Sequence, residues 1–128
     1  MTTTYVLDGQ RIHNLEDFWR VMGEAVNGPG GYFGRNLDAF RDCLWGGFGT
    51  PDDGEFKVQW REHACSKQAL GYPETVRQLE IRLKRCHPTN RGWVTEDLNA
   101  ALAGRGPTVF DWLVEIFEET APEALELG

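Results

Sequence analysis

Apolar and polar residues along the chain follow the two spacings that distinguish helices from strands. Residues 5–7 form a short apolar run before an Asp-Gly turn, which predicts a strand. Asn14 is a favourable N-cap for a helix over about residues 15–26, and a glycine-rich stretch over residues 27–31 ends this helix. Its inner face is predicted to carry Leu15, Phe18, Met22 and Val26.

The middle of the chain begins with an alternating pattern. Residues 56–61 alternate between apolar and polar side chains, which predicts a half-buried or edge strand, and a helix over about residues 62–70 follows. Pro73 then opens a segment with apolar residues at helical spacing up to about residue 86. A strand is the alternative here, because three apolar residues of the segment also alternate: Leu79, Ile81 and Leu83.

Helical spacing continues toward the end of the chain. A short helix is expected over about residues 95–103, and a longer one over about residues 109–120. Residues 125–127 are a candidate final strand. Strands separated by helices indicate an α/β fold with a small parallel sheet, here as a single domain over residues 1–128. The longer helix is predicted to bury Phe110, Leu113, Ile116 and Phe117.

Residues 32–47, YFGRNLDAFRDCLWGG, combine an aromatic pair, a glycine, a helix cap and a short acidic helix. Asn36 is the predicted N-cap, and Asp38 and Asp42 lie four residues apart, so they project from one face. A like-charge pair at this spacing costs about 0.2–0.5 kcal/mol, and a helix that ends near Gly46 places Asp42 close to its negative end. The two carboxylates are therefore either a binding surface for a partner or an ordinary solvated face.

The net charge of −7 is distributed unevenly along the chain. Residues 61–106 contain eight Lys and Arg against five Asp and Glu, whereas the rest of the chain contains fifteen acidic and five basic residues. Such an acidic body is a poor binder of nucleic acid and suits a partner with a cationic site, although negative charge also simply keeps proteins in solution.

Composition also bears on location. No apolar run approaches the ~20 residues of a membrane span. The first residues lack the basic and apolar regions of a signal peptide, so we expect a cytoplasmic protein that binds no membrane. The three cysteines, Cys43, Cys65 and Cys86, are then expected to be free thiols buried in the fold.

The sequence offers two weak candidates for metal binding or catalysis. Two Cys–His groups, at residues 63–65 and 86–87, match no standard zinc finger in their spacing, so we expect no metal and no cofactor. Asp38 and Asp42 could serve as the acid–base pair of a small hydrolase, but neighbouring turns of an exposed helix provide no cleft. We therefore do not expect an enzyme.

The acidic segment closely resembles the inhibitory segment of the barstar family, intracellular inhibitors of secreted guanyl-preferring microbial ribonucleases. Barstar-like chains carry Y-(Y/F)-G-x-N-L-D-A-x-x-D-C-L-x-G at this place. The present chain matches this string in register and without a gap at Tyr32, Phe33, Gly34, Asn36, Leu37, Asp38, Ala39, Asp42, Cys43, Leu44 and Gly46.

The resemblance implies the barstar fold, a small three-stranded parallel sheet covered by helices. It covers residues 5–70 continuously and resumes over residues 109–127. The basic stretch near residues 71–106 has no counterpart in the shortest family members and becomes a helical insertion. This insertion could widen a partner interface, hold a second copy of the chain or cover an edge of the sheet.

The resemblance also implies a role for each residue of a partner-binding surface. Asp42 would occupy the phosphate position in the cationic cleft of the ribonuclease, and Asp38 would pair with a second base on the cleft wall. Tyr32 would lie against the catalytic histidine of the enzyme, while Gly34 and Asn36 shape the loop at its rim. The same surface is expected to include Leu37, Arg41, Gly46 and a carboxylate from Glu118 or Glu119.

Two positions depart from the family pattern. Arg41 and Gly47 stand where barstar has tryptophan, and an arginine beside two aspartates would repel a very basic enzyme. The implied function is an immunity protein that binds a secreted guanyl-specific ribonuclease one to one, in the producing cell before export, with a target different from barnase. The alternative is a barstar-fold module that binds another cationic protein, such as a toxin.

Overall fold

Three parallel strands form one sheet in the computed structural model, which describes residues 2–51 and 54–128. Strand β1 (Thr3–Asp8) and strand β3 (Leu125–Leu127) flank the central strand β2 (Phe56–Arg61). Both pairings are parallel, which confirms the α/β fold expected from the sequence. The half-buried strand predicted over residues 56–61 is present, but it is the central strand and not an edge strand.

Six α-helices connect these strands in the part of the chain that the structure describes. The segment from Pro73 is helical throughout, so the alternative strand is wrong, and the helix expected near residue 95 begins four residues earlier, at Arg91. Two short 3-10 helices are η1 (Gly9–Arg11) and η2 (Pro88–Asn90). The α-helices are α1 (Leu15–Asn27), α2 (Leu37–Trp45), α3 (His63–Ala69), α4 (Tyr72–Arg85), α5 (Arg91–Leu102) and α6 (Val109–Thr120).

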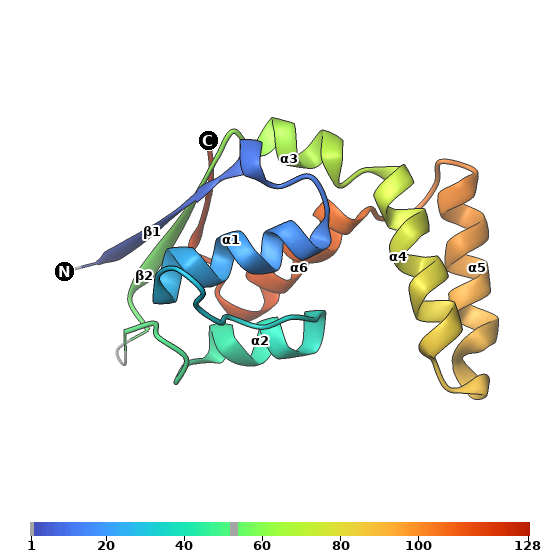
Figure 1. Cartoon of the computed structure of the whole chain (residues 1–128), viewed down its shortest axis with the longest axis horizontal. Coiled ribbons are helices and arrows are strands. Elements are labelled where there is room, and N and C mark those ends of the chain that lie inside the picture. Colours follow the sequence, from blue (N-terminus) through green and yellow to red (C-terminus); the bar gives the residue numbers. More distant parts are fainter. Residues whose placement is uncertain (1, 52–53) are drawn as a thin grey trace.

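Three of these helices cover one face of the sheet. Figure 1 shows α1, α2 and α6 grouped on one side of β1 and β2. In β2, the residues that face the helices are fully or almost fully buried, whereas Lys57 and Gln59 between them are only half-buried. The core therefore lies between one face of the sheet and these three helices, and the buried β2 residues are Phe56, Val58 and Trp60.

The core contains a cluster of aromatic rings around Phe40, a fully buried residue of α2. Its ring centroid lies 5.3 Å from those of Phe18 and Phe117, 5.6 Å from that of Trp19 and 6.0 Å from that of Phe33. Edge-on and tilted arrangements at these distances are favourable for aromatic pairs. Phe40 therefore holds the middle of α2 against α1 and α6.

Two glycines allow α1 to contact the loop that follows it. A Cβ atom on Gly23 would collide with the carbonyl oxygen of Gly31, and a Cβ on Gly31 would lie 2.6 Å from the carbonyl oxygen of Gly23. Real Cβ atoms do not approach backbone atoms so closely, and overpacking of this kind is destabilising. The loop that leads to Tyr32 is consequently packed directly on the backbone of α1.

Helices α4 and α5 form a pair, here called the hairpin (residues 72–102), that projects away from the sheet (Figure 1). Leu79 of α4 and both Val94 and Ala101 of α5 are buried, yet they do not belong to the main core cluster. Helices α4 and α5 pack closely against each other along their length. Most of residues 71–106 is thus helical, as expected, and the hairpin does not cover an edge of the sheet.

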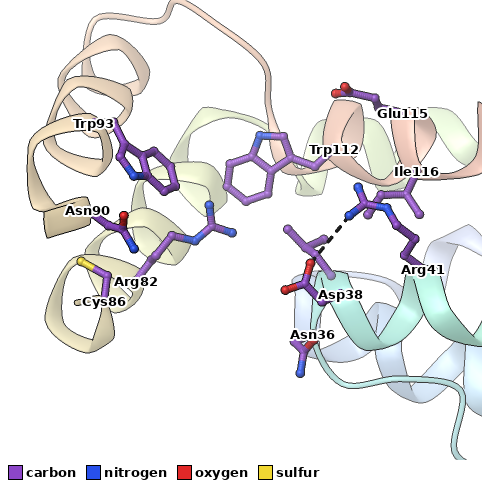
Figure 2. Close-up of a pocket in the computed structure, with 11 residues that line it drawn as sticks. Asn36, Asp38, Arg41, Arg82, Cys86, Asn90, Trp93, Trp112, Glu115 and Ile116 are labelled. Carbon is purple, nitrogen blue, oxygen red and sulfur yellow. Dashed lines mark ion pairs between the residues drawn. The ribbon is translucent and has the colours of Figure 1, made fainter. Parts of the chain in front are cut away.

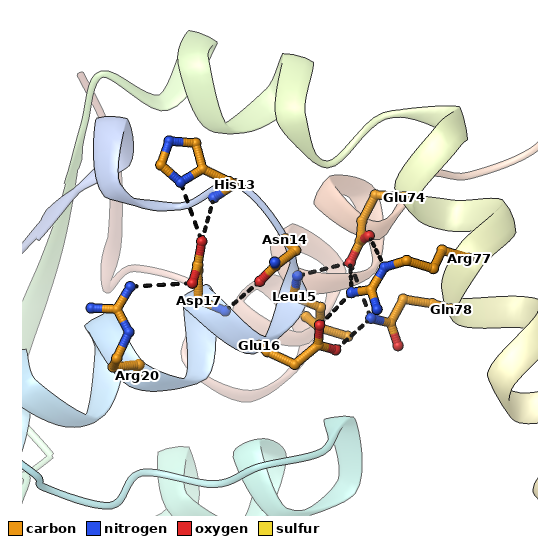
Figure 3. A network of polar contacts seen from close by, with 9 residues as sticks. All are labelled: His13, Asn14, Leu15, Glu16, Asp17, Arg20, Glu74, Arg77 and Gln78. Atoms are coloured by element: carbon orange, nitrogen blue, oxygen red, sulfur yellow. Dashed lines mark hydrogen bonds and ion pairs between the residues drawn. The ribbon is translucent and has the colours of Figure 1, made fainter.

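A buried carboxylate attaches the hairpin to α1 (Figure 3). Glu74, whose side chain is 7% exposed, accepts a 2.9 Å hydrogen bond from the backbone N–H of Leu15. It also accepts hydrogen bonds from Arg77 Nε at 2.6 Å and from Gln78 Nε2 at 3.0 Å. Arg77 and Gln78 both reach Glu16 on α1 as well. The first turns of α1 and α4 are therefore joined by one polar network.

The pKa of Glu74 makes the stability of this junction depend on pH. Burial raises the pKa of the carboxyl, but the hydrogen bonds from Arg77, Gln78 and Leu15 and the charge of Arg77 outweigh burial and hold it below its ordinary value. A carboxyl with a lowered pKa stabilises the fold above its unfolded pKa, about 4.3, and this contribution is lost as the pH falls through the folded pKa.

We expect Glu74→Gln to lower the free energy of unfolding at pH 7 by about 1–3 kcal/mol, because a charged acceptor of four hydrogen bonds is lost. The difference from the unaltered protein should shrink as the pH falls below the unfolded pKa of about 4.3 and toward the lowered pKa of the folded state. Urea unfolding at pH 7 and pH 3.5 measures both effects. Glu80→Gln, a change at an exposed carboxylate of the same helix, is the control. If Glu74→Gln lowered the free energy of unfolding by the same amount at both pH values, the expectation would be contradicted.

The cysteines fit the sequence expectation only in part. Cys43 is buried and Cys86 is partly exposed, but Cys65 is exposed, so the expectation of a buried thiol is wrong at that position. The short helix α3 lies at the surface and buries Ser66 instead, whose hydroxyl donates to the carbonyl oxygen of Gly9. Among the residues that the structure describes, no helix has the length and apolar character needed to cross a membrane.

Candidate partner-binding site

Local sequence signals define both ends of the acidic helix α2. The side-chain oxygen of Asn36 accepts a 2.8 Å hydrogen bond from the backbone N–H of Ala39, which is the N-cap that the sequence predicts. Gly46 follows the last helical residue with a φ of 131°, a conformation that favours glycine. Because Phe40, Cys43 and Leu44 are buried, the opposite face of α2 is turned to solvent.

Asp38 and Asp42 lie on this solvent face. The side chain of Asp38 is 95% exposed, and Asp42 is also exposed. Within residues 2–51 and 54–128, Asp42 makes no ion pair with a basic side chain. A carboxylate that is exposed, without a counter-ion and mounted on a capped helix is free to accept hydrogen bonds from a partner.

The loop before α2 is held in one shape by its glycine. Gly34 has a φ of 89°, and a Cβ atom there would lie 2.7 Å from the backbone nitrogen of Phe40. Only glycine fits this position, so Gly34 sets the path of the loop rather than offering a side chain. Next to it, Phe33 is buried while Tyr32 is 45% exposed, which leaves the Tyr32 ring available to a partner.

Asn27, at the end of α1, ties together the segments on both sides of α2. Its Nδ2 donates one hydrogen bond to the carbonyl oxygen of Tyr32 and a second to that of Phe48, each at 2.7 Å. The sequence analysis did not single out this residue, because nothing in its local pattern indicates contacts with two loops. Asn27 therefore holds the backbone on both sides of the acidic helix in place, including the backbone at Tyr32.

Arg41 connects α2 to the end of α6. Its guanidinium nitrogens lie 3.6 Å from a carboxylate oxygen of Asp38 and 3.5 Å from one of Glu119. The structure thus brings Glu119, rather than Glu118, into the acidic site, although both side chains are exposed. All three members of this ion-pair group are solvent-accessible, so each pair stabilises the fold by at most about 1 kcal/mol. Arg41 nevertheless reduces the negative charge at Asp38 and leaves that of Asp42 unopposed.

Cys43 offers no reactive thiolate beside these aspartates. Burial raises the pKa of its thiol, and the negative charge of Asp42 raises it further, so the thiol stays protonated near neutral pH. Of the two aspartates, Asp38 lines the neighbouring cleft and Asp42 does not. An exposed carboxylate on a helix fixed in the core is an arrangement suited to binding.

A cleft of about 640 Å³ begins at the first turn of α2 (Figure 2). On one side lie Asn36, Asp38 and Arg41, and on the other lie hairpin residues that the sequence analysis did not assign to a site. Figure 2 shows the rings of Trp93 and Trp112 facing each other across this space. One feature of the sequence could have indicated this part of the site, namely a tryptophan among polar residues on a basic helix pair. This residue, Trp93, is 47% exposed.

Comparison with known families decides which proteins this chain belongs with. The model of the family described as Barstar (barnase inhibitor) matches residues 2–86. The chain belongs to the barstar family. The match runs through α4, beyond the continuous resemblance over residues 5–70, and it ends where the second helix of the hairpin has not yet begun.

Membership of the barstar family carries a general function. Members of this family are ribonuclease inhibitors. They bind a ribonuclease and do not themselves catalyse a reaction. The segment with the loop, Asn36, Asp38 and Asp42 lies entirely within the matched residues. Helix α6, which contributes Glu119, and strand β3 lie outside them.

Proposed function

We propose that this chain inhibits a secreted guanyl-specific ribonuclease by placing the carboxylate of Asp42 in its phosphate-binding site. The observation that carries this proposal is the state of Asp42, which is exposed and without an ion pair in the described part of the chain, on a helix anchored by Phe40. The inhibitor forms a one-to-one complex and protects the producing cell before the enzyme is exported.

Inhibition follows from charge and shape. A ribonuclease holds the scissile phosphate with cationic side chains, and a carboxylate accepts charge-assisted hydrogen bonds from the same groups. No bond is cleaved, because the carboxylate offers no phosphodiester. Asp38 pairs with a second basic group, the exposed ring of Tyr32 lies against the catalytic histidine, and Glu119 extends the acidic surface beyond α2.

The loop and helix are already shaped for this contact. Gly34 and Asn36 fix the path into α2, and Asn27 holds the loops on both sides of it. A preformed binding surface loses little conformational freedom on association, which favours affinity. Leu37 and Gly46 define the two ends of the helix within the same surface.

The test is inhibition of a panel of purified guanyl-specific microbial ribonucleases by the unaltered chain, with titration to establish stoichiometry. Tight, competitive, one-to-one inhibition of at least one enzyme is the expected result. If every enzyme of the panel retains full activity in the presence of excess protein, the guanyl-ribonuclease proposal is wrong. The acidic surface would then belong to a complex with a different cationic protein.

Arg41 predicts which ribonucleases are inhibited best. Because its positive charge lies among the acidic contacts, it repels the most basic enzymes, and we expect the target to be less basic than barnase. Arg41→Ala should strengthen inhibition of barnase about fivefold, since it removes a repulsive charge and frees Asp38. Inhibition constants at low and high salt measure the effect, with the exposed Arg105→Ala as control. Weaker inhibition of barnase by Arg41→Ala would contradict this view.

A further inference from the structure

The cleft beside α2 is one part of a longer groove between the hairpin and the core. A second hollow, of about 660 Å³, adjoins it on the side of α1. Both hollows are lined by Asn36, Leu37, Arg82 and Trp112, so they form one continuous depression, here called the hairpin groove. The groove therefore begins within the proposed inhibitory surface and extends along α4.

Basic side chains dominate the second hollow of the hairpin groove, which Asp38 does not line. Arg35, Arg82 and Arg85 line it, and none of the three forms an ion pair with any residue that the structure describes. The guanidinium carbon of Arg82 lies 5.2 Å from the ring centroid of Trp112, a cation–π contact that leaves its N–H donors free. Arg77 also lines this part, but Glu16 and Glu74 already neutralise it.

The two ends of the site thus carry opposite charge. Asp42 and Asp38 form the acidic end on α2, and three arginines without an ion pair among the described residues form the basic end beside α4. Charges of two partners that face each other across a specific interface are of opposite sign, because like charges repel each other there. A partner that fits both ends carries cationic and acidic groups side by side.

We propose that the hairpin groove is the second half of the ribonuclease interface and receives acidic side chains that lie beside the cationic cleft of the enzyme. This inference rests on the proposed function and adds to it the chemistry of the surface around the enzyme's active site. Since Asp38 lines the groove, an enzyme that pairs with Asp38 lies directly beside the groove. Exposed Trp93 then provides a flat apolar contact on the hairpin side.

Two other occupants fit the charges less well. A nucleic acid would meet Asp38 and Glu115, which line the same groove and repel phosphates. A second copy of the chain would bring together two molecules that each have a net charge of −7. An enzyme with an acidic patch next to a cationic cleft satisfies both ends at once, and a strongly basic enzyme does not.

The deciding comparison is between two neighbouring residues of α4. Arg85 lines the groove and is exposed, whereas Lys84 is exposed but lines neither hollow. Arg85→Glu and Lys84→Glu therefore make the same change in net charge at adjacent positions, inside and outside the proposed contact. Neither residue has an ion pair in the described part of the chain, so both variants are expected to fold.

Inhibition constants are measured for both variants, the unaltered chain and Asp42→Ala against the best-inhibited enzyme of the panel. We expect Arg85→Glu to weaken inhibition about tenfold or more, with a smaller dependence on salt, and Lys84→Glu to change it by about twofold or less. Loss in Asp42→Ala shows separately that the α2 site is engaged. Equal effects of the two α4 changes, or none, would overturn the proposal for the groove while leaving the proposed function intact.

The remaining outcomes also overturn the groove proposal. Failure of the unaltered chain to inhibit any enzyme would remove it together with the proposed function. A dimer in sedimentation that Arg85→Glu dissociates, with inhibition unchanged, would assign the groove to a second copy. Binding of a short RNA that Arg85→Glu abolishes, with inhibition again unchanged, would assign it to nucleic acid.

Discussion

Asp42→Ala is expected to weaken inhibition by at least about thirtyfold and to leave the protein at least as stable as before. Hot-spot residues, for which barnase–barstar is the standard example, cost at least about 2 kcal/mol of binding when truncated, or roughly thirtyfold in Kd. Asp42 meets the conditions for such a residue, because its carboxylate is exposed, is unpaired among the described residues and extends from a helix fixed in the core.

The same carboxylate costs stability in the free protein. Asp42 lies four residues after Asp38 and in the last turns of α2, where the negative end of the helix disfavours an anion. Alanine removes both penalties and is the best helix former, so a gain of about 0.5–1 kcal/mol is expected. A residue that lowers stability and is required for binding is retained for its contact with a partner.

Urea unfolding and inhibition assays on the same preparations test both halves of this expectation. Glu126→Ala removes one exposed carboxylate from strand β3, away from α2, and should change neither inhibition nor stability appreciably. If Asp42→Ala inhibits as well as the unaltered chain, the role of Asp42 is wrong. If it loses inhibition only together with stability, the loss reports unfolding of α2 rather than a lost contact.

Phe40→Ala is expected to have the largest effect on stability. Phe40 is fully buried, and its ring contacts four other aromatic rings from α1, α6 and the loop before α2. Truncation of a buried phenylalanine costs about 3–5 kcal/mol, because apolar area is lost and a cavity remains. A loss of this size is a large part of the stability of most single domains.

Phe40→Ala should also weaken inhibition, since the acidic helix loses its attachment to the core. The free energy of unfolding is measured in urea, and hydrogen exchange of the α2 amides shows whether the helix has loosened. Phe48→Ala is the matched control, because Phe48 is 45% exposed and its removal should cost about 0.5 kcal/mol or less. A cost below about 1 kcal/mol for Phe40→Ala would mean that α2 is held by other contacts.

Local signals in the sequence were sufficient for most of the elements. Helices α1 and α2 begin directly after their predicted caps, Asn14 and Asn36, because an asparagine N-cap is specified by a single residue and its neighbours. Helix α6 has the predicted bounds and buries its predicted apolar face. The start of α5 was missed, since this helix follows η2 directly and Asn90 makes no side-chain cap.

Features that depend on distant residues could not be predicted in the same way. The position of β2 at the centre of the sheet follows from its pairing with both β1 and β3, which lie near opposite ends of the chain. The exposure of Asp38 and Asp42, in contrast, could be predicted, because it follows from helical spacing alone. The pairing of Arg41 with Glu119, and the approach of Arg82 and Trp93 to α2, join segments that local patterns do not connect.

Asn27 has a consequence for how this surface can change. A single side chain holds the loops before and after α2, so the helix is mounted between two fixed points on the end of α1. The segment behaves as an exchangeable cassette, in which outward-facing positions such as Arg41 can be replaced while the backbone keeps its place. A new target can therefore be matched by a few side chains, without a new arrangement of the chain.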